Sequence, residues 1–164
     1  MTARRQVTNM MIIRQASSGD EIDTARELFR EYQRVMDIDL CFQGFEAELA
    51  NLPGKYAPPA GRLLIAYVDE KAAGCIALRD LGDGVCEMKR LYVRSAFRGR
   101  RLGQLLVQRL IDDARTIGYT KMRLDTAPAK MGRAVQLYEA HGFREIAPYY
   151  DNPNEGVKYM ELML

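Results

Sequence analysis

The spacing of apolar residues in the first third of the chain predicts one strand followed by two helices. Residues 11–16 (MIIRQA) form a short β-like run. Residues 17–37 then carry apolar side chains at helical spacing, and Ser18 with Glu21 fits a capping box at the start of that helix. A second, short helix is expected at Phe45–Leu52.

The middle of the chain changes to β-like runs and predicts an antiparallel meander. After a loop rich in Pro and Gly at 52–61, three such runs follow at 62–68, 72–81 and 85–93. Short turns, DEK and GDG, join them. Three consecutive antiparallel strands are the simplest arrangement of such runs.

Helical spacing returns after the third run. Leucine and isoleucine residues between 102 and 117 lie on one stripe, and Gly118 is suited to end the helix. The remaining expected elements are a strand at 121–126, a helix at 131–141, and strands at 143–150 and 157–164. The order β-α-α-β-β-β-α-β-α-β-β predicts a mixed α/β fold in which Val85–Thr126 forms a parallel, right-handed β-α-β crossover.

Length and composition indicate one domain. The chain has 164 residues, of which 48% are hydrophobic and 28% charged, so a single domain over 1–164 with a real core is expected, and 1–10 should be a loose extension. A net charge of +2 is too balanced for a general nucleic-acid binder. No apolar run approaches the roughly 20 residues of a membrane span, and no secretory signal is expected.

The three cysteines give no sign of a metal site or a disulfide framework. Cys41, Cys75 and Cys86 are odd in number and lack metal-type spacing. The last two fall inside apolar runs, where small core residues are expected. This usage predicts a cytoplasmic protein without a metal ion.

The segment RGRRLG (98–103) raises the first question of function. It places Arg98, Arg100 and Arg101 at a helix start, where each cation is disfavoured by about 0.3–1 kcal/mol unless an anion offsets it. A Walker-type loop is excluded because Gly103 is followed by Gln-Leu, and a dinucleotide fingerprint would need a third glycine. A diphosphate held by main-chain N–H groups remains, beside the alternative of a solvated basic turn.

Two segments together resemble a known family. CEMKRLYVRSAFRGRRLGQLL (86–106) closely resembles the strand–loop–helix signature of the GNAT family of acyl-CoA-dependent N-acyltransferases, Gln/Arg-x-x-Gly-x-Gly/Ala. MGRAVQLYEAHGF (131–143) matches the family's second signature from Ala134 onward. Arg101 stands where the family usually has a middle glycine, and its amide is expected to bind phosphate without a positive φ. Met131 replaces an Asn and cannot offer that residue's hydrogen bonds to the pantetheine arm.

The resemblance implies a GNAT-like fold over nearly the whole chain and acetyl-CoA as co-substrate. Strand 85–93 should splay from strand 121–126, leaving main-chain groups to pair with the pantetheine arm, while the diphosphate lies at RGRRLG. The cofactor-binding residues implied are Leu91, Tyr92, Val93, Arg98, Gly99, Arg100, Arg101, Leu102, Gly103 and Gln104.

The resemblance also implies a base and an acid for direct transfer of the acetyl group to a primary amine. Deprotonating an alkyl ammonium of pKa roughly 10.4 at pH 7 costs about 4–5 kcal/mol, so a base is useful. Glu87 stands where the family often has that base, and alternation places it on one face with Leu91 and Val93, where apolar surroundings would raise its pKa. The alternative is a strand carboxylate paired with Lys89 or an arginine across the sheet. Tyr138 is the implied acid for the leaving thiolate; the alternative is a core tyrosine.

Candidates for the amine acceptor site come from two segments. They are Asp37, Asp39, Glu46, Glu48, Tyr149, Tyr150, Asp151 and Asn152. Acids and aromatic rings suit an ammonium-bearing small molecule or peptide, although they equally suit exposed loops. His141, the single histidine, is expected to cap a helix end instead of acting in catalysis.

Three functions stay open, with the N-acetyltransferase in the lead. The second is a non-catalytic module of the same fold that binds acyl-CoA as a sensor. The third, a nucleic-acid binder using the arginine turn, would show an affinity that falls steeply with salt, and the near-neutral charge argues against it. A homodimer also stays open.

Overall fold

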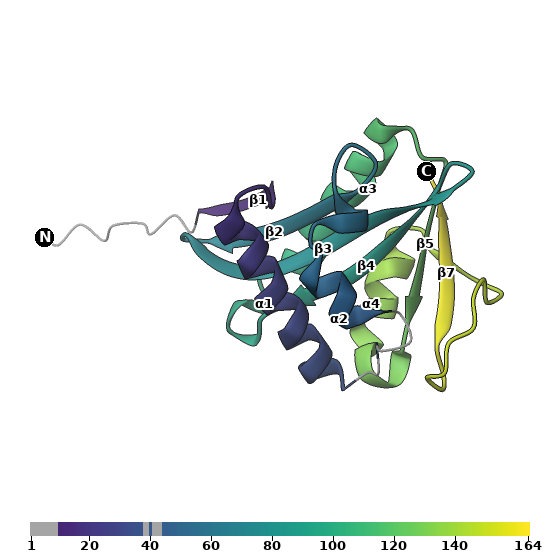
Figure 1. Cartoon of the computed structure of the whole chain (residues 1–164). Coiled ribbons are helices and arrows are strands. Elements are labelled where there is room, and N and C mark those ends of the chain that lie inside the picture. Colours follow the sequence, from purple (N-terminus) through teal and green to yellow (C-terminus); the bar gives the residue numbers. More distant parts are fainter. Residues whose placement is uncertain (1–9, 38–39, 41–43) are drawn as a thin grey trace, which may run out of the picture.

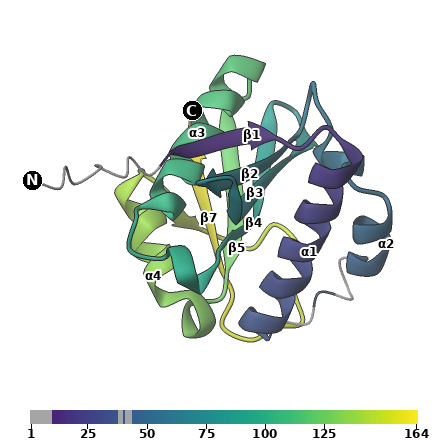
Figure 2. The same ribbon diagram turned by 90° about the vertical axis from the view of Figure 1, so that its left-hand side faces the viewer.

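The computed structural model describes residues 10–37, 40 and 44–164. Within these ranges one seven-stranded sheet runs in the order β1-β2-β3-β4-β5-β7-β6. Helices α1 and α2 cover one face of the sheet, and α3 and α4 cover the other (Figures 1 and 2). The predictions made for residues 1–9, Asp39 and Cys41 lie outside the described residues.

The mixed α/β order expected from the sequence is confirmed. The strands are β1 Met11–Gln15, β2 Arg62–Val68, β3 Lys71–Gly82, β4 Val85–Val93, β5 Lys121–Thr126, β6 Arg144–Ile146 and β7 Lys158–Met163. The helices are α1 Gly19–Met36, α2 Phe45–Ala50, α3 Leu102–Ile117 and α4 Pro128–Ala140. Along the described ranges no helix has the length and apolar character needed to cross a bilayer.

Helix α1 begins where its sequence predicts. The Ser18 hydroxyl accepts a hydrogen bond from the Glu21 amide at 3.1 Å, and a Glu21 carboxylate oxygen accepts one from the Ser18 amide at 3.3 Å. This capping box satisfies two amides that the first turn would otherwise leave without partners. It fixes the helix so that Leu28 and Phe29, both fully buried, pack on the sheet.

The sheet separates two hydrophobic cores. On the α1/α2 face, Phe29 and Phe45 pack over Ile65 and Ala77. On the α3/α4 face the core is larger and contains Leu64, Ile76, Leu78, Met88, Leu91, Leu106, Leu110, Met122, Leu124 and Tyr138. The side on which a strand residue lies therefore decides which of the two helical layers it contacts.

A bulge in β4 changes that side partway along the strand. Ala77 pairs with Lys89 and Cys75 with Tyr92, so one residue of β3 faces two residues of β4. Arg90 takes a φ of 62° at this point. A bulge of this kind shifts the alternation of side chains by one residue.

The bulge corrects the face predicted for Glu87. Strict alternation puts Glu87 on the side of Leu91 and Val93. The extra residue instead places Leu91 in the α3/α4 core with Met88, whose side chain alternates with that of Glu87. Glu87 therefore lies on the α1/α2 face, opposite Leu91 and Val93.

Strands β4 and β5 separate after three residue pairs, as the family resemblance implies. They run parallel and pair only as Val85 with Lys121, Cys86 with Met122, and Glu87 with Arg123. Beyond these pairs β4 continues to Val93, while β5 continues to Thr126 against β7. The sheet therefore opens between the last residues of β4 and β5.

Among the predicted elements, a helix and a strand differ most in their bounds. Helix α4 begins at Pro128 and not at 131, because a proline in the first turn sacrifices no helical hydrogen bond. Strand β6 ends at Ile146 and does not reach 150. Pro148 has no N–H to donate to a ladder, and the chain leaves the sheet just before it.

Candidate active site

The turn before α3 differs from the prediction at Arg101. This residue is the N-cap of α3 and has a φ of 59° and a ψ of 24°, so it is left-handed. The expectation that it would avoid positive φ is wrong, because the turn requires the conformation for which the family's glycine is suited. A non-glycine residue pays about 1–2 kcal/mol to adopt it. Gly99 also has a positive φ, 82°.

A groove of about 620 Å³ runs from the opening in the sheet to this turn, mainly on the α3/α4 face, and Met36 of α1 also lines it. Most of the predicted cofactor residues line it, namely Leu91, Tyr92, Val93, Arg98, Gly99, Arg101, Leu102 and Gly103. Arg100 and Gln104 are not among the lining residues. The Arg100 guanidinium lies over the Phe97 ring at 5.7 Å, and Gln104 is exposed on α3.

Helix α4 supplies groove residues that sequence reasoning missed. Lys130, Gly132 and Arg133 line the wall that faces the turn. Their signal was present, because Lys130 directly precedes the segment that carries the second family signature and Arg133 lies inside that segment. With Arg98 and Arg101 they place four basic residues around one groove, and such an arrangement suits a phosphorylated ligand.

A second, much smaller cavity of about 20 Å³ lies within the opening of the sheet and has room for about one water molecule. Its lining comes from both faces: Tyr32, Met88, Lys89, Arg90, Leu91, Leu124, Asp125 and Tyr138. Leu91 lines the groove as well. The groove and the small cavity therefore adjoin at Leu91, next to charged side chains that come from the α1/α2 face.

Tyr138 is both a core residue and a lining residue of this cavity. It is almost fully buried, and its ring lies edge-on to Phe143 with 5.9 Å between centroids. Burial raises the pKa of its hydroxyl, which is consequently protonated at neutral pH. The two interpretations of this residue do not exclude each other.

Glu87 is fully buried and has three polar partners. Arg79 Nε lies 2.7 Å and Lys89 Nζ 3.5 Å from Oε1, while the Tyr149 hydroxyl donates to Oε2 at 2.6 Å. Burial alone would raise the pKa of Glu87, but Lys89, Tyr149 and Arg79 together hold it below its usual range. The raised pKa expected from apolar surroundings is wrong, and the alternative pairing with Lys89 and an arginine is confirmed.

Lys89 is a buried cation that sequence reasoning treated only as a partner of Glu87. Its side chain is 4% exposed, and it lines the small cavity. Burial lowers its pKa, Glu87 and Asp125 raise it, and Arg90 and Arg79 lower it further, with a result of about 8. A lysine in the middle of the β-like run CEMKRLYV, which predicts a strand inside the sheet, is the signal that marks it.

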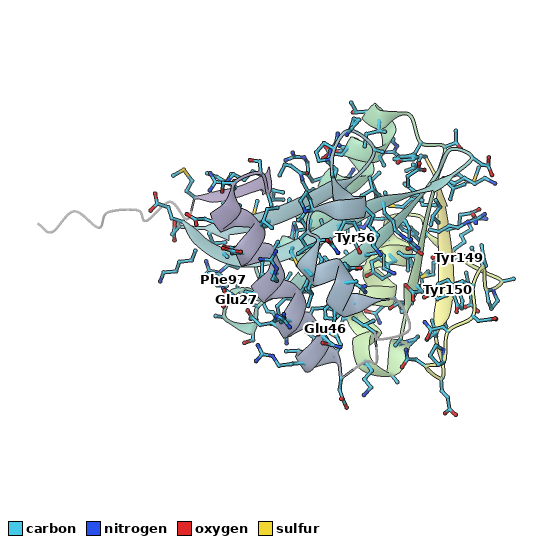
Figure 3. The ribbon with its side chains drawn as sticks, viewed as in Figure 1. Glu27, Glu46, Tyr56, Phe97, Tyr149 and Tyr150 are labelled. Atoms are coloured by element: carbon cyan, nitrogen blue, oxygen red, sulfur yellow. The ribbon has the colours of Figure 1, made fainter. Side chains whose placement is uncertain are left out.

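The predicted acceptor residues separate into two groups. One group lies against Glu87 and Asp125 and consists of Tyr149, Tyr150 and Asn152. The Tyr150 hydroxyl donates a hydrogen bond to Asp125, and Asn152 Nδ2 donates one to the same carboxylate oxygen at 3.3 Å. The rings of Tyr149 and Tyr150 make an edge-to-face contact with 5.3 Å between their centroids, next to β7 (Figure 3). Asp125, which alternation alone does not single out, joins this group to the cavity.

The acidic candidates of the first two helices lie elsewhere. Asp37 and Glu46 have exposed side chains paired with Lys130 and Arg30. Glu48 is buried and binds Arg90 through both oxygens, at 3.0 and 3.1 Å. Burial raises the pKa of Glu48, yet Arg90 and Lys55 lower it to about 2. Asp151 is exposed. Glu48 therefore supports the bulge instead of presenting a charge to a ligand.

The remaining candidates have structural places. His141 is the C-cap residue of α4, and its Nδ1 lies 2.9 Å from the Leu137 carbonyl oxygen, as expected of a helix end. Cys75 and Cys86 are buried, and burial raises the pKa of Cys86 to about 12. No group of acidic, His or Cys side chains suited to a metal ion occurs in the described ranges.

Comparison with known proteins identifies the family. A model of the acetyltransferase (GNAT) family matches residues 22–143. The chain belongs to the GNAT acetyltransferase family. An uncharacterized N-acetyltransferase of Schizosaccharomyces pombe is 44% identical to this GNAT chain over 144 residues, covering 87% of the chain and 88% of that protein.

Solved structures share the GNAT fold. An acetyltransferase from Streptococcus agalactiae superposes with a TM-score of 0.78 at 26% identity, covering 94% of this chain and 98% of that one. The structure of YncA from Salmonella typhimurium, solved with its cofactor acetyl-CoA, gives a TM-score of 0.65 at 21% identity over 94% of each chain. This fold agrees with the element order read from the sequence.

Proposed function

We propose that this GNAT protein transfers an acetyl group from acetyl-CoA to a primary amine by direct attack of the amine on the thioester. The observation that carries the proposal is the junction at Leu91. There the basic groove of the α3/α4 face meets the cavity that Lys89, Asp125 and Tyr138 line. A donor and an acceptor could enter from opposite faces and meet at the opening of the sheet.

The groove suits the donor in size and charge. A volume of about 620 Å³ falls within the ordinary range of small-molecule sites, roughly 300–1,000 Å³. Main-chain groups of Leu91–Val93, which do not pair with β5, would hold the amides of the pantetheine arm. Amides of the turn and of the start of α3 would hold the diphosphate, together with the side chains of Arg98 and Arg101.

Proton transfer is assigned to Glu87 and Tyr138. As the amine nitrogen bonds to the acetyl carbon and the carbon–sulfur bond breaks, the nitrogen must lose a proton and the thiolate must gain one. Glu87 is the base in this proposal, ionised at neutral pH because its pKa lies below its usual range. Tyr138 is the proposed donor to the thiolate, since it lines the cavity where the bond would break.

A non-catalytic acyl-CoA sensor is the second candidate. The observation that favours it is the carboxylate of Glu87, whose two oxygens already have three partners. A base bound in this way gains less from accepting a proton than an unpaired carboxylate would. The groove would be the same in both cases, so ligand binding alone does not separate them.

Thiol release separates the two functions. The wild-type protein is mixed with acetyl-CoA and a panel of amino acids, polyamines, aminoglycosides and peptides, while calorimetry follows binding of acetyl-CoA. The enzyme is expected to release one thiol for each acetylated amine found by mass spectrometry. Saturable binding without turnover across the whole panel would support the sensor, and the absence of any binding would reject both.

A further inference from the structure

Lys89 stands between Glu87 and the place where an amine would react. The cavity in the sheet opening is lined by Lys89, Asp125 and Tyr138, and Glu87 is not among its lining residues. Lys89 Nζ lies 3.5 Å from Oε1 of Glu87. A proton that leaves an amine nitrogen at the edge of this one-water cavity for Glu87 therefore meets the lysine first.

We propose that Lys89 is the catalytic group that takes the proton from the acceptor amine, and that Glu87 acts through it. This inference rests on the proposed acetyltransferase function and refines its base. In such a pair the Glu87 carboxylate orients the Lys89 amino group and stabilises the Lys89 ammonium ion that forms, as a carboxylate does behind a catalytic histidine. Glu87 is then a positioning residue.

The surroundings of Lys89 suit a group that changes its charge near neutral pH. Four charged residues act on Lys89 directly, namely Glu87 and Arg90 on β4, Arg79 on β3 and Asp125 on β5. Tyr32 on α1 and Tyr138 on α4 line the same cavity. Glu48 on α2 lies behind Arg90 and pairs with it. Burial lowers the pKa of Lys89 to about 8, although Glu87 and Asp125 oppose the change. An ordinary lysine, at roughly 10.4, would be almost entirely ammonium at that pH.

Asp125 does not replace Lys89 in this role. The Tyr150 hydroxyl and the amide of Asn152 both donate to its Oδ2. The carboxylate raises the pKa of Lys89 from the β5 side of the opening, as Glu87 does from its own strand. Two carboxylates therefore hold one lysine at the junction of the two faces.

The proton balance closes with one proton released to solvent. The acceptor ammonium first loses this proton, and the resulting amine attacks the acetyl carbon. As the amide forms, its nitrogen loses a second proton to neutral Lys89, the carbon–sulfur bond breaks, and the thiolate leaves. A thiol of pKa near 8.5 and a lysine of pKa about 8 are matched, so Lys89 can return a proton to the thiolate by way of the Tyr138 hydroxyl in the same cavity.

Substitution of Lys89 by arginine distinguishes a lysine that accepts a proton from a lysine that only pairs its positive charge with Glu87. Lys89→Arg keeps a cation next to Glu87, yet a guanidinium does not lose its proton at these pH values. We expect the kcat of Lys89→Arg and Lys89→Met to fall by about 10²–10⁴-fold, the usual effect of losing general-base catalysis. Affinity for acetyl-CoA, measured by calorimetry, should change by less than about threefold, because Lys89 does not line the groove.

Lys158→Arg is the matched control. It exchanges the same residue types on β7, where Lys158 pairs with the exposed Glu145, and it should leave kcat unchanged. A Lys89→Arg enzyme with the kcat of the wild type would overturn the inference while leaving the acetyltransferase intact. A wild-type protein that turns over no amine would overturn the proposed function and the inference together.

The pH profile of Glu87→Gln gives a readout that a purely structural role would not move. In the wild type, kcat should fall as pH decreases through about 8, because Lys89 becomes protonated. Glu87 raises the pKa of Lys89, so its replacement by Gln should move this limb to lower pH. If kcat of Glu87→Gln no longer fell at low pH, the carboxylate itself would be the group that takes the proton, and the role of Lys89 would be contradicted.

Discussion

The groove on the α3/α4 face and the charged cluster on the α1/α2 face meet at Leu91, but they are built in different ways. The groove consists of main-chain amides, a left-handed turn and basic side chains near solvent. The cluster consists of Glu48, Glu87, Lys89 and Arg90, all buried. A salt bridge at the surface contributes about 0–1 kcal/mol to the free energy of unfolding, whereas breaking a buried ion pair lowers it by about 3–5 kcal/mol.

This difference implies different tolerances in the two regions. A groove of amides and exposed cations should lose affinity by degrees when one cation is removed. A buried cluster should lose stability or turnover steeply, because the partner left behind has no water to replace the lost interaction. Substitutions in the cluster should therefore have larger effects than substitutions in the groove.

Glu48→Ala should have the largest effect on stability. It leaves the buried guanidinium of Arg90 without its bidentate partner, so the free energy of unfolding should fall by about 3–5 kcal/mol. Urea denaturation followed by circular dichroism measures the change. Glu46→Ala on the same helix is the control, since the Glu46 side chain is 73% exposed, and it should change stability by less than about 0.5 kcal/mol. Equal losses in both variants would refute the contrast.

Glu87→Gln should mainly affect turnover. The carboxylate that supports proton transfer is lost, so kcat should fall by about 10²–10⁴-fold while the affinity for acetyl-CoA stays within about threefold. Steady-state thiol release and calorimetry give the two numbers. Glu145→Gln, an exposed residue on β6, should leave both unchanged. A parallel loss of affinity and turnover would place Glu87 in the groove instead of the cluster.

Arg101→Glu should weaken binding of acetyl-CoA at the groove. The substitution places a negative charge beside the diphosphate, and we expect Kd to rise by roughly 10–100-fold at low salt and by less at high salt. Calorimetric titration at two ionic strengths is the measurement. Arg144→Glu makes the same charge change on β6, away from the groove, and should have little effect. An unchanged Kd in Arg101→Glu would move the diphosphate away from the turn.

Arg101→Gly should produce the smallest changes, a gain in stability together with a loss of affinity for acetyl-CoA. Glycine adopts the φ of 59° without strain, so stability should rise by up to about 1 kcal/mol. The lost cation should still weaken acetyl-CoA binding, though less than Arg101→Glu does. Thermal unfolding together with calorimetry measures both changes. A loss of stability would mean that the arginine side chain supports the turn.

The groove could largely be predicted from the sequence, because local signals specify it. A basic turn before a helix, two glycines and an apolar strand occupy a contiguous stretch, and most of the residues implied for the cofactor line one groove. The φ of Arg101 escaped prediction because a family pattern describes the usual residue and not the backbone that the turn requires here.

The cluster could be predicted only in part. The pairing of Glu87 with Lys89 or an arginine was one of two alternatives for that residue, but the rest of the cluster depends on pairing between distant segments. One extra residue at Arg90 reverses the face of everything after it, and alternation within β4 does not reveal this. Arg79, Glu48 and Tyr149 reach the same strand from three other segments. The pKa of Glu87 follows from these contacts and not from its apolar neighbours in sequence.

A crystal structure of the protein with acetyl-CoA would test most directly whether donor and acceptor meet at the opening of the sheet. The account predicts the diphosphate at Gly99–Gly103, the pantetheine arm along Leu91–Val93, and the acetyl group next to the cavity that Lys89 and Tyr138 line. Acetyl-CoA bound on the α1/α2 face, or with its thioester away from this cavity, would contradict it.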